Sequence, residues 1–313
     1  MRILPVCVHG TPVSQGAPVQ CMKAYSRQAQ PGSKWLSPDG SVPAPPWPST
    51  HNRRSRSAHV SVAVMLNWRD YGGYGSRLGG RVARDRLFRC AAPVGLSKSE
   101  RRRIEALSLA AVIDLRGAAE RREDPTFWPG FDVPVFTVDP NTDWQLQLLD
   151  NSSSGAYDAA IAHKVMLAAY TEMPYRPALL PAYRMYFQAL AGAEGPTLVH
   201  CFAGKDRTGL AVALLQHLLG VHVDDIMSEY LRTNETGNSA LSEFVLKQHL
   251  RTKSSITLTP EGLCVFSSVS PDYLRTAFEV IGARSGSIDA YLQDVIGVTP
   301  EARSAIHRRL LIG

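Results

Sequence analysis

The sequence has no long hydrophobic run. No apolar stretch in its 313 residues approaches the roughly 18 residues that a membrane helix needs. Nor do the first 30 residues contain an apolar core of signal-peptide length between Arg2 and Lys23. We therefore expect no membrane span and a cytoplasmic location, with export that needs no leader left open.

The sequence also lacks the paired cysteines of a structural zinc site. Its five cysteines are spread along the chain without a C-x-x-C pair, and histidines and acids form no convincing cluster of ligands beside them. Structural zinc sites require four such ligands at close spacing. The sequence therefore predicts no metal site.

Acidic residues are scarce in residues 1–60, where seven basic side chains accompany a single acid, Asp39. The other 253 residues hold 27 basic and 27 acidic side chains, so the whole net charge of +6 lies in this segment. It also holds nine of the 21 prolines and shows no helix or strand period, which predicts a disordered extension. A proline-rich or basic tether and a dispensable tail both stay open as interpretations. The neutral remainder predicts no nucleic-acid partner.

From residue 61 to residue 313, strand and helix patterns alternate, which predicts one α/β domain with a mostly parallel central sheet flanked by helices. Ser97 and Glu100 have the spacing of a capping box at the start of a helix. The later part of the domain is mostly helical. The expected strands cover 86–91, 110–116, 132–138 and 197–200, and the expected helices cover 97–109, 157–172, 177–192 and 208–220.

One segment, TLVHCFAGKDRTGLAV (197–212), stands apart from this pattern. A buried strand ends at His200, Cys201 opens a short loop, and a helix follows. Backbone N–H groups of such a loop and of the helix N-terminus form a cradle for an anion. Gly204 can adopt the positive φ that a tight cradle requires, and Arg207 can grip two oxygens of one phosphate.

The same cradle favours an ionised Cys201. Helix N-termini and cationic neighbours stabilise a thiolate, which is the nucleophilic form of cysteine. Thr208 follows the arginine and can donate its hydroxyl to the sulfur. His200 lies on the strand side, so we expect it to hold the loop by hydrogen bonding and not to act as a base.

The loop HCFAGKDRTG resembles the cysteine-dependent phosphatase signature HC-x5-R-[ST], and most closely the HC-x-x-GKDRT loop of bacterial atypical tyrosine phosphatases. NWRDYGGY (67–74) is similar to that family's NFRDLGGY, and RLFRCA and VIDLR to its next two strands. SGSIDAYLQDVIGVT (285–299) resembles its YGS-x-x-x-YL-x-x-x-GV ending, with Ser285 in place of the usual tyrosine. The resemblance covers about residues 65–313. It implies a dual-specificity-phosphatase-like fold with a helical C-terminal region that includes a lid over 235–265.

The resemblance also implies hydrolysis of phosphotyrosine through a phosphocysteine on Cys201, without a metal or other cofactor. Arg207 and the loop residues Phe202, Ala203 and Gly204 would bind the phosphoryl group, as would His200 and Thr208. Phosphoserine, phosphothreonine and phosphoinositides stay open as further substrates. The partners implied are phosphotyrosine proteins and, as the alternative, inositol lipids.

The acid that protonates the leaving group is not settled by the resemblance. Trp128 and Pro129 are followed by Gly130, so the WPD loop of many tyrosine phosphatases is not matched. Asp206 is the first candidate. Asp114, at the end of a strand, is the second, and its alternative role is to pair with Arg116.

Lys205 has two interpretations: it adds charge toward a second phosphate, or it is a solvated lysine at the rim of the loop. Arg69 and Asp70 are expected to form a structural salt bridge.

Two functions of other classes stay open: a rhodanese-like sulfurtransferase, and a pseudophosphatase that binds without turnover.

Overall fold

The computed structural model describes residues 66–126, 133–138, 156–235 and 257–313. The expected extension over residues 1–60 lies outside the described residues. So does 236–256, which is the greater part of the expected lid.

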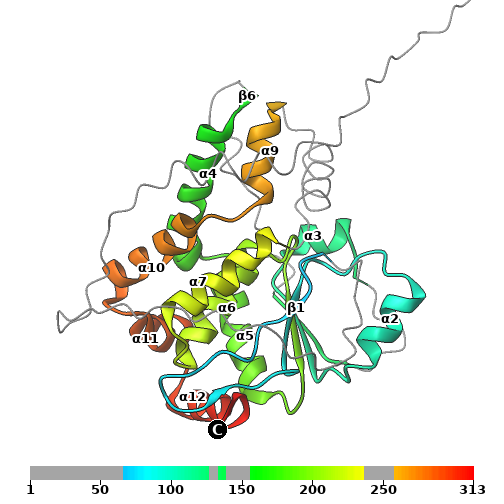
Figure 1. Cartoon of the computed structure of the whole chain (residues 1–313), viewed down its shortest axis with the longest axis vertical. Coiled ribbons are helices and arrows are strands. Elements are labelled where there is room, and N and C mark those ends of the chain that lie inside the picture. Colours follow the sequence, from blue (N-terminus) through cyan, green and yellow to red (C-terminus); the bar gives the residue numbers. More distant parts are fainter. Residues whose placement is uncertain (1–65, 127–132, 139–155, 236–256) are drawn as a thin grey trace, which may run out of the picture. The chain divides into compact units, whose positions relative to one another are not determined.

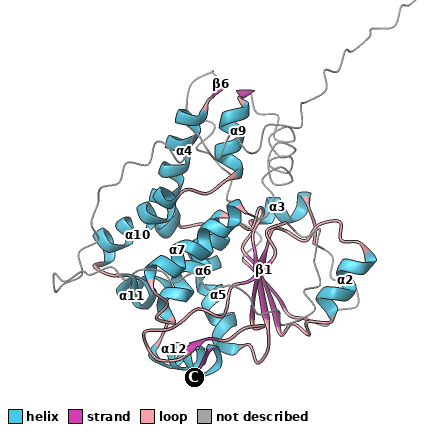
Figure 2. Cartoon of the chain, viewed as in Figure 1, coloured by secondary structure: helices cyan, strands magenta, loops and turns pink. Residues whose placement is uncertain are grey.

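A five-stranded sheet forms the centre of the domain (Figure 2). Its first pair is antiparallel, and every other neighbouring pair is parallel. The mostly parallel α/β fold predicted from the sequence is thereby confirmed. In spatial order the strands are β1 (Arg69–Asp70), β3 (Leu87–Cys90), β7 (Thr197–His200), β4 (Ala111–Asp114) and β5 (Val135–Thr137).

The two faces of the sheet bury different helices, because successive side chains of a strand point to opposite faces. Phe88, Val112 and Leu198 pack with Ile104 of α2 (Lys98–Glu105) in the smaller core cluster. Leu87, Ile113 and Val199 belong to the larger cluster on the other face. Figure 1 shows α2 on one side of the sheet and the helices of the larger cluster on the other. That larger cluster draws on α4 (Ala159–Glu172), α5 (Leu180–Gly192), α6 (Asp206–Leu218) and α12 (Pro300–Leu310).

Local signals in the sequence set several helix ends. The Ser97–Glu100 capping box is present, and Ser270 and Thr299 cap helices whose first turns carry the expected prolines. Helix α6 begins at Asp206, two residues earlier than predicted. An acidic first residue suits that position because it complements the positive end of the helix dipole.

The remaining described elements surround this framework. α9 (Pro260–Ser267) lies along α4, and α10 (Pro271–Ser285) also packs on α4 (Figure 1). Two small two-stranded sheets join β2 (Arg81–Val82) to β9 (Leu311–Ile312) and β6 (Ala156–Tyr157) to β8 (Thr257–Leu258). The other helices are α3 (Ala118–Glu123), α7 (Val223–Leu231), α11 (Ile288–Ala290), the short turns Met173–Tyr175 and Arg232–Asn234, and a π-helical turn at Tyr291–Ile296.

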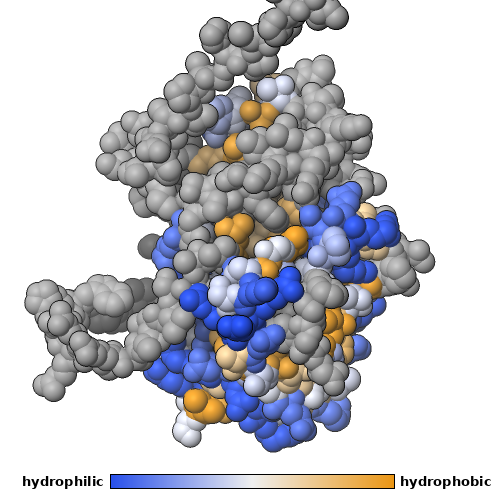
Figure 3. Space-filling view, turned by 90° about the vertical axis from the view of Figure 1, so that its right-hand side faces the viewer, coloured by the Kyte–Doolittle hydropathy of each residue, from blue (hydrophilic) through white to orange (hydrophobic). Residues whose placement is uncertain are grey.

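The outer surface is mixed in character. Figure 3 views the side on which α2 lies in Figure 1, and hydrophilic residues cover much of the lower part of that face. Helix α2 contributes Lys98, Arg102 and Arg103, which are exposed. None of the helices in the described ranges is both long enough and apolar enough to pass through a bilayer.

Replacing a helical glycine by alanine should change the stability of the fold in opposite directions at two positions. In Gly262→Ala the new Cβ would overlap the carbonyl oxygen of Tyr157 in β6, so α9 must move away from it at a cost of about 2 kcal/mol. In Gly282→Ala, within α10, the Cβ meets no described atom within 4 Å, so the helix gains about 0.5–1 kcal/mol. Urea denaturation followed by circular dichroism measures both, and equal effects would contradict the close approach of α9.

Candidate active site

The loop that follows β7 lies at the centre of the sheet's carboxyl edge. β7 is the middle strand, between β3 and β4, so both neighbours flank the loop. Cys201 directly follows the strand and is only 2% exposed. Helix α6 begins at Asp206, so its N-terminus closes the loop on the other side. The structure therefore brings Cys201 and the start of α6 together, as the sequence predicted.

Hydrogen bonds hold the first loop carbonyls away from the inside of the loop. The Nδ1 atom of His200 lies 3.2 Å from the carbonyl oxygen of Cys201, and because a carbonyl only accepts, Nδ1 carries the proton. The backbone N–H of Ala92 donates to the carbonyl of Phe202 at 2.8 Å. His200 therefore holds the loop, which is the role expected from the sequence.

The carbonyl of Gly204 is held by two buried side chains. Asn67 donates from Nδ2 at 2.7 Å, and the same atom lies 3.5 Å from the carbonyl of Ala203. Arg89, on β3, donates from Nη2 at 2.7 Å. Sequence reasoning did not identify either donor. Both stand in segments that carry the family resemblance, but nothing in the sequence gives their partners.

These contacts explain how the loop can bind an anion. In a trans peptide unit the C=O and the following N–H point in opposite directions. Because the carbonyls of residues 201–204 point toward donors outside the loop, the N–H groups of residues 202–205 point inward. Gly204 has φ of +62°, and a Cβ there would overlap the carbonyl oxygen of Cys90. Glycine is therefore required at this position.

A buried ion-pair network supports the two donors. Arg69 donates from Nε to Glu229 of α7 at 2.6 Å and from Nη1 to Oδ1 of Asn67. Arg89 lies 3.5 Å from the same glutamate. The predicted salt bridge between Arg69 and Asp70 is therefore wrong. Adjacent residues of a strand point to opposite faces, and the carboxylate of Asp70 instead accepts backbone N–H bonds.

Arg207 is clamped by Glu120 of α3. Its Nη1 and Nη2 atoms each donate to one carboxylate oxygen at 2.6 Å, which fixes the plane of the guanidinium. Burial would lower the pKa of Arg207, but Glu120 outweighs it and raises that pKa above its ordinary value. Glu120 was missed in the sequence. Its only signal is an acid in the first helical turn after the VIDLR strand.

Asp114 is fully engaged by Arg116. Both carboxylate oxygens accept from the guanidinium, at 2.7 to 3.1 Å, and the side chain is 1% exposed. Burial opposes ionisation, but His200 and Arg116 outweigh it and hold the pKa of Asp114 below its ordinary value. Burial also lowers the pKa of His200, and the Asp114 carboxylate opposes that shift. The pairing of Asp114 with Arg116, one of its two expected roles, is what the structure shows.

Lys205 points away from the inside of the loop. Its three N–H donors face three acceptors: the carbonyls of Phe266 and Ser268 at 2.7 and 3.0 Å, and Asp206 at 3.4 Å. The side chain is 2% exposed. The interpretation of Lys205 as a solvated residue at the rim is therefore wrong, because the end of α9 covers it.

Asp206 and Thr208 lie at the start of α6. The carboxylate of Asp206 is 20% exposed and accepts a hydrogen bond from Tyr170 of α4 at 2.8 Å. Thr208 is buried, and within the described residues its hydroxyl has no hydrogen-bond partner. The expected bond from Thr208 to the Cys201 sulfur is therefore not made in this structure.

No group of three or more potential metal ligands occurs within the described ranges.

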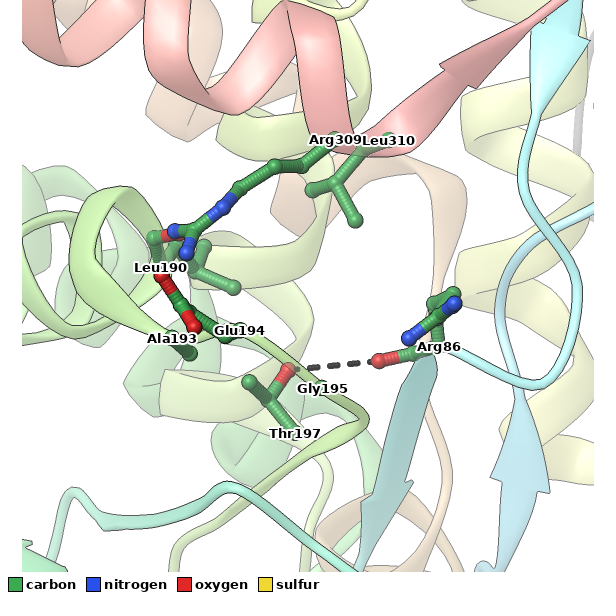
Figure 4. Close-up of a pocket in the computed structure, with 8 residues that line it drawn as sticks. All are labelled: Arg86, Leu190, Ala193, Glu194, Gly195, Thr197, Arg309 and Leu310. Atoms are coloured by element: carbon green, nitrogen blue, oxygen red, sulfur yellow. Dashed lines mark hydrogen bonds between the residues drawn. The ribbon is translucent and has the colours of Figure 1, made fainter.

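A cavity of about 200 Å³ lies at the opposite edge of the sheet, where β3 and β7 begin (Figure 4). There the hydroxyl of Thr197 bonds the carbonyl of Arg86, and Arg309 donates to carbonyls at the end of α5. We assign this cavity no part in the reaction because the loop lies at the other end of the same strands. It is lined by Arg86, Leu190, Ala193, Glu194, Gly195, Thr197, Arg309 and Leu310.

Comparison with known proteins agrees with this geometry. A model of the tyrosine phosphatase family matches residues 60–312, and the chain belongs to that family. It is a protein-tyrosine phosphatase, as the resemblance of its loop predicted.

Two relatives match most of their own length. The chain is 31% identical over 279 residues, 85% of this chain and 95% of the relative, to a Cupriavidus necator protein whose name places it among the tyrosine-protein phosphatases. It is 28% identical over 237 residues, 67% and 85% of the two chains, to the triple specificity protein phosphatase PtpB of Mycobacterium tuberculosis. A tyrosine-protein phosphatase of Nostoc commune is 28% identical over 48% of each chain.

The buried pair of Asp114 and Arg116 predicts a pH-dependent loss of stability. The folded pKa of Asp114 lies below the unfolded value of about 3.9. Its contribution is therefore complete above that pH and is lost as the pH falls through the folded pKa. Asp114→Asn should cost about 3 kcal/mol at neutral pH, because it leaves a buried guanidinium without its carboxylate.

Urea denaturation from neutral pH down to about pH 3 tests this, since the variant should lack the acid-dependent loss seen in the wild type. Asp289→Asn is the matched control. It removes an exposed carboxylate that pairs with Arg303, and should cost less than about 1 kcal/mol. Equal costs for the two variants would show that the buried pair does not stabilise the fold.

Proposed function

We propose that this tyrosine phosphatase transfers the phosphoryl group to Cys201, with Arg207 binding it and Asp206 acting as the acid. The observation that carries the proposal is the orientation of the loop. The carbonyls of residues 201–204 all lie near donors outside it, which turns the N–H groups of residues 202–205 toward its inside. Such a ring of donors stabilises both the thiolate and the charge on a transferring phosphoryl group.

In the first step the thiolate of Cys201 attacks phosphorus. The S–P bond forms, the P–O bond to the tyrosine breaks, and the leaving oxygen takes a proton from the Asp206 carboxyl. Arg207 and the N–H groups of Phe202, Ala203 and Gly204 hold the three non-bridging oxygens. Glu120 orients Arg207, because both of its oxygens bond the guanidinium.

In the second step water attacks the phosphocysteine. The new P–O bond forms, the S–P bond breaks, and the thiolate is restored as inorganic phosphate leaves. Asp206, ionised after the first step, accepts the proton of the attacking water. His200 takes no part in either proton transfer, because its Nδ1–H faces the Cys201 carbonyl.

We infer that phosphotyrosine is the main substrate and that phosphoserine, phosphothreonine and phosphoinositides are secondary ones. The support for a wider range is the relative named a triple specificity protein phosphatase. Against a strong lipid preference stands Lys205, whose donors face Asp206 and carbonyls at the end of α9 in place of a second phosphate. Turnover of a phosphopeptide panel beside short-chain phosphoinositides tests this ranking.

The nucleophile is tested with Cys201→Ser. Turnover of p-nitrophenyl phosphate should fall by at least about 10⁴-fold, since a serine hydroxyl is not ionised in the cradle. Calorimetric titration with a phosphotyrosine peptide should still show binding. Cys90→Ser, which changes a buried cysteine on the neighbouring strand, should retain turnover. If the Cys201→Ser variant turned over p-nitrophenyl phosphate as fast as the wild type, the phosphocysteine intermediate would be refuted.

The acid is tested with Asp206→Asn. Phenyl phosphate has a poor leaving group that needs protonation, so kcat should fall by about 100-fold. p-Nitrophenyl phosphate leaves as a stable anion, so its loss should be much smaller. A series of aryl phosphates gives the slope of log kcat against leaving-group basicity. A uniform loss along the series would indicate that Asp206 binds substrate and does not donate the proton.

A further inference from the structure

A chain of hydrogen bonds leads from the core to Asp206. Tyr230 of α7 donates from its hydroxyl to that of Tyr170 at 2.8 Å. Tyr170 of α4 then donates to Oδ1 of Asp206 at 2.8 Å. Side chains of α7, α4 and α6 are thus linked in series, and the series ends at one oxygen of the carboxyl group.

The direction of the chain is fixed by chemistry. Burial, with the charge of Asp206 adding to it, raises the pKa of both Tyr170 and Tyr230 well above the ordinary value, so both hydroxyls keep their protons. A tyrosine hydroxyl has one proton to donate. Tyr170 donates its hydrogen bond to Asp206, and its oxygen accepts one from Tyr230.

Oδ1 of Asp206 therefore faces donors only. Besides the Tyr170 hydroxyl, the ammonium of Lys205 lies 3.4 Å from the same oxygen. A proton on Oδ1 would point at one of these donors and lose the hydrogen bond. The carboxyl group must then carry its proton on Oδ2.

We propose that Tyr170 is a positioning residue that confines the acidic proton of Asp206 to Oδ2 and holds that oxygen toward the leaving group. The inference rests on the proposed role of Asp206 as the acid. In the first step the Oδ2–H bond breaks and the O–H bond of the leaving group forms. Tyr170 does not touch the substrate and neither gains nor loses a proton.

The ring of Tyr170 is rigid enough for this role. It is fully buried, stacks on Tyr273 with ring centres 5.4 Å apart, and meets the edge of Tyr230 at 6.4 Å. A hydroxyl on a side chain locked by packing can hold a partner within a few tenths of an ångström. The hydroxyl of Tyr273 lies 3.1 Å from Nδ1 of His163 and takes no part in the series of hydrogen bonds to Asp206.

Tyr170→Phe tests the proposal, because it removes the hydroxyl and keeps the ring. We expect kcat for phenyl phosphate to fall about tenfold, a part of what a general acid contributes. For p-nitrophenyl phosphate kcat should stay within about twofold, and KM should not change for either substrate. The slope of log kcat against leaving-group basicity should therefore become steeper, which a merely structural effect would not produce.

Tyr273→Phe is the matched control. It removes a hydroxyl from a buried tyrosine of the same cluster that bonds His163 and not Asp206. We expect the wild-type slope. If Tyr170→Phe and Tyr273→Phe lower kcat equally for every leaving group, or if neither changes the slope, the proposal is overturned.

Two further variants keep the test decisive. Tyr230→Phe leaves the bond from Tyr170 to Asp206 intact but removes the donor to Tyr170, so it should steepen the slope less than Tyr170→Phe. It replaces Tyr170→Phe as the test if that variant does not fold. In the Asp206→Asn background, Tyr170→Phe should add nothing, since both act on one proton. If Asp206→Asn steepens the slope and neither tyrosine variant does, this inference alone fails. If Asp206→Asn leaves the slope unchanged, the acid itself is wrong.

Discussion

The capture of one backbone carbonyl determines the shape of the active-site loop. Gly204 would otherwise be free to turn its carbonyl toward the phosphate, where it would repel an anion. The buried amide of Asn67 and the guanidinium of Arg89 hold that oxygen outside the loop at 2.7 Å each. Because their own positions depend on Arg69 and Glu229, the anion site rests on a network far larger than the signature loop.

Each buried arginine near the loop has a carboxylate partner. Arg207 pairs with Glu120, Arg116 pairs with Asp114, and Arg69 and Arg89 share Glu229. Buried charges without partners cost several kcal/mol, so this pairing makes so many cations tolerable in one region. It also means that the loop draws much of its attraction for phosphate from backbone N–H groups, which carry no net charge.

The sequence predicted the local features well. Four of the five strands of the sheet, the capping box at Ser97, the positive φ of Gly204 and the helix after the loop each depend on neighbouring residues, whose pattern is visible in one dimension. The family resemblance supplied the chemistry of the loop.

Contacts between distant segments could not be predicted in this way. Glu120 and Arg207 are 87 residues apart, and Tyr170 and Asp206 are 36 apart, with no spacing rule that links them. The expected pair of Arg69 and Asp70 was wrong because adjacency in sequence was taken for adjacency in space. Lys205 was misjudged because its acceptors are main-chain carbonyls, which have no signature in the sequence.

Through those carbonyls Lys205 also has a structural role. Phe266 and Ser268 stand at the end of α9, where a helix has oxygens without an internal partner. A residue of the phosphatase signature thus serves as the C-terminal cap of a helix some sixty positions later. Two parts of the protein that are read as separate motifs are therefore constrained to change together, and the lysine in the signature is explained by architecture as much as by chemistry.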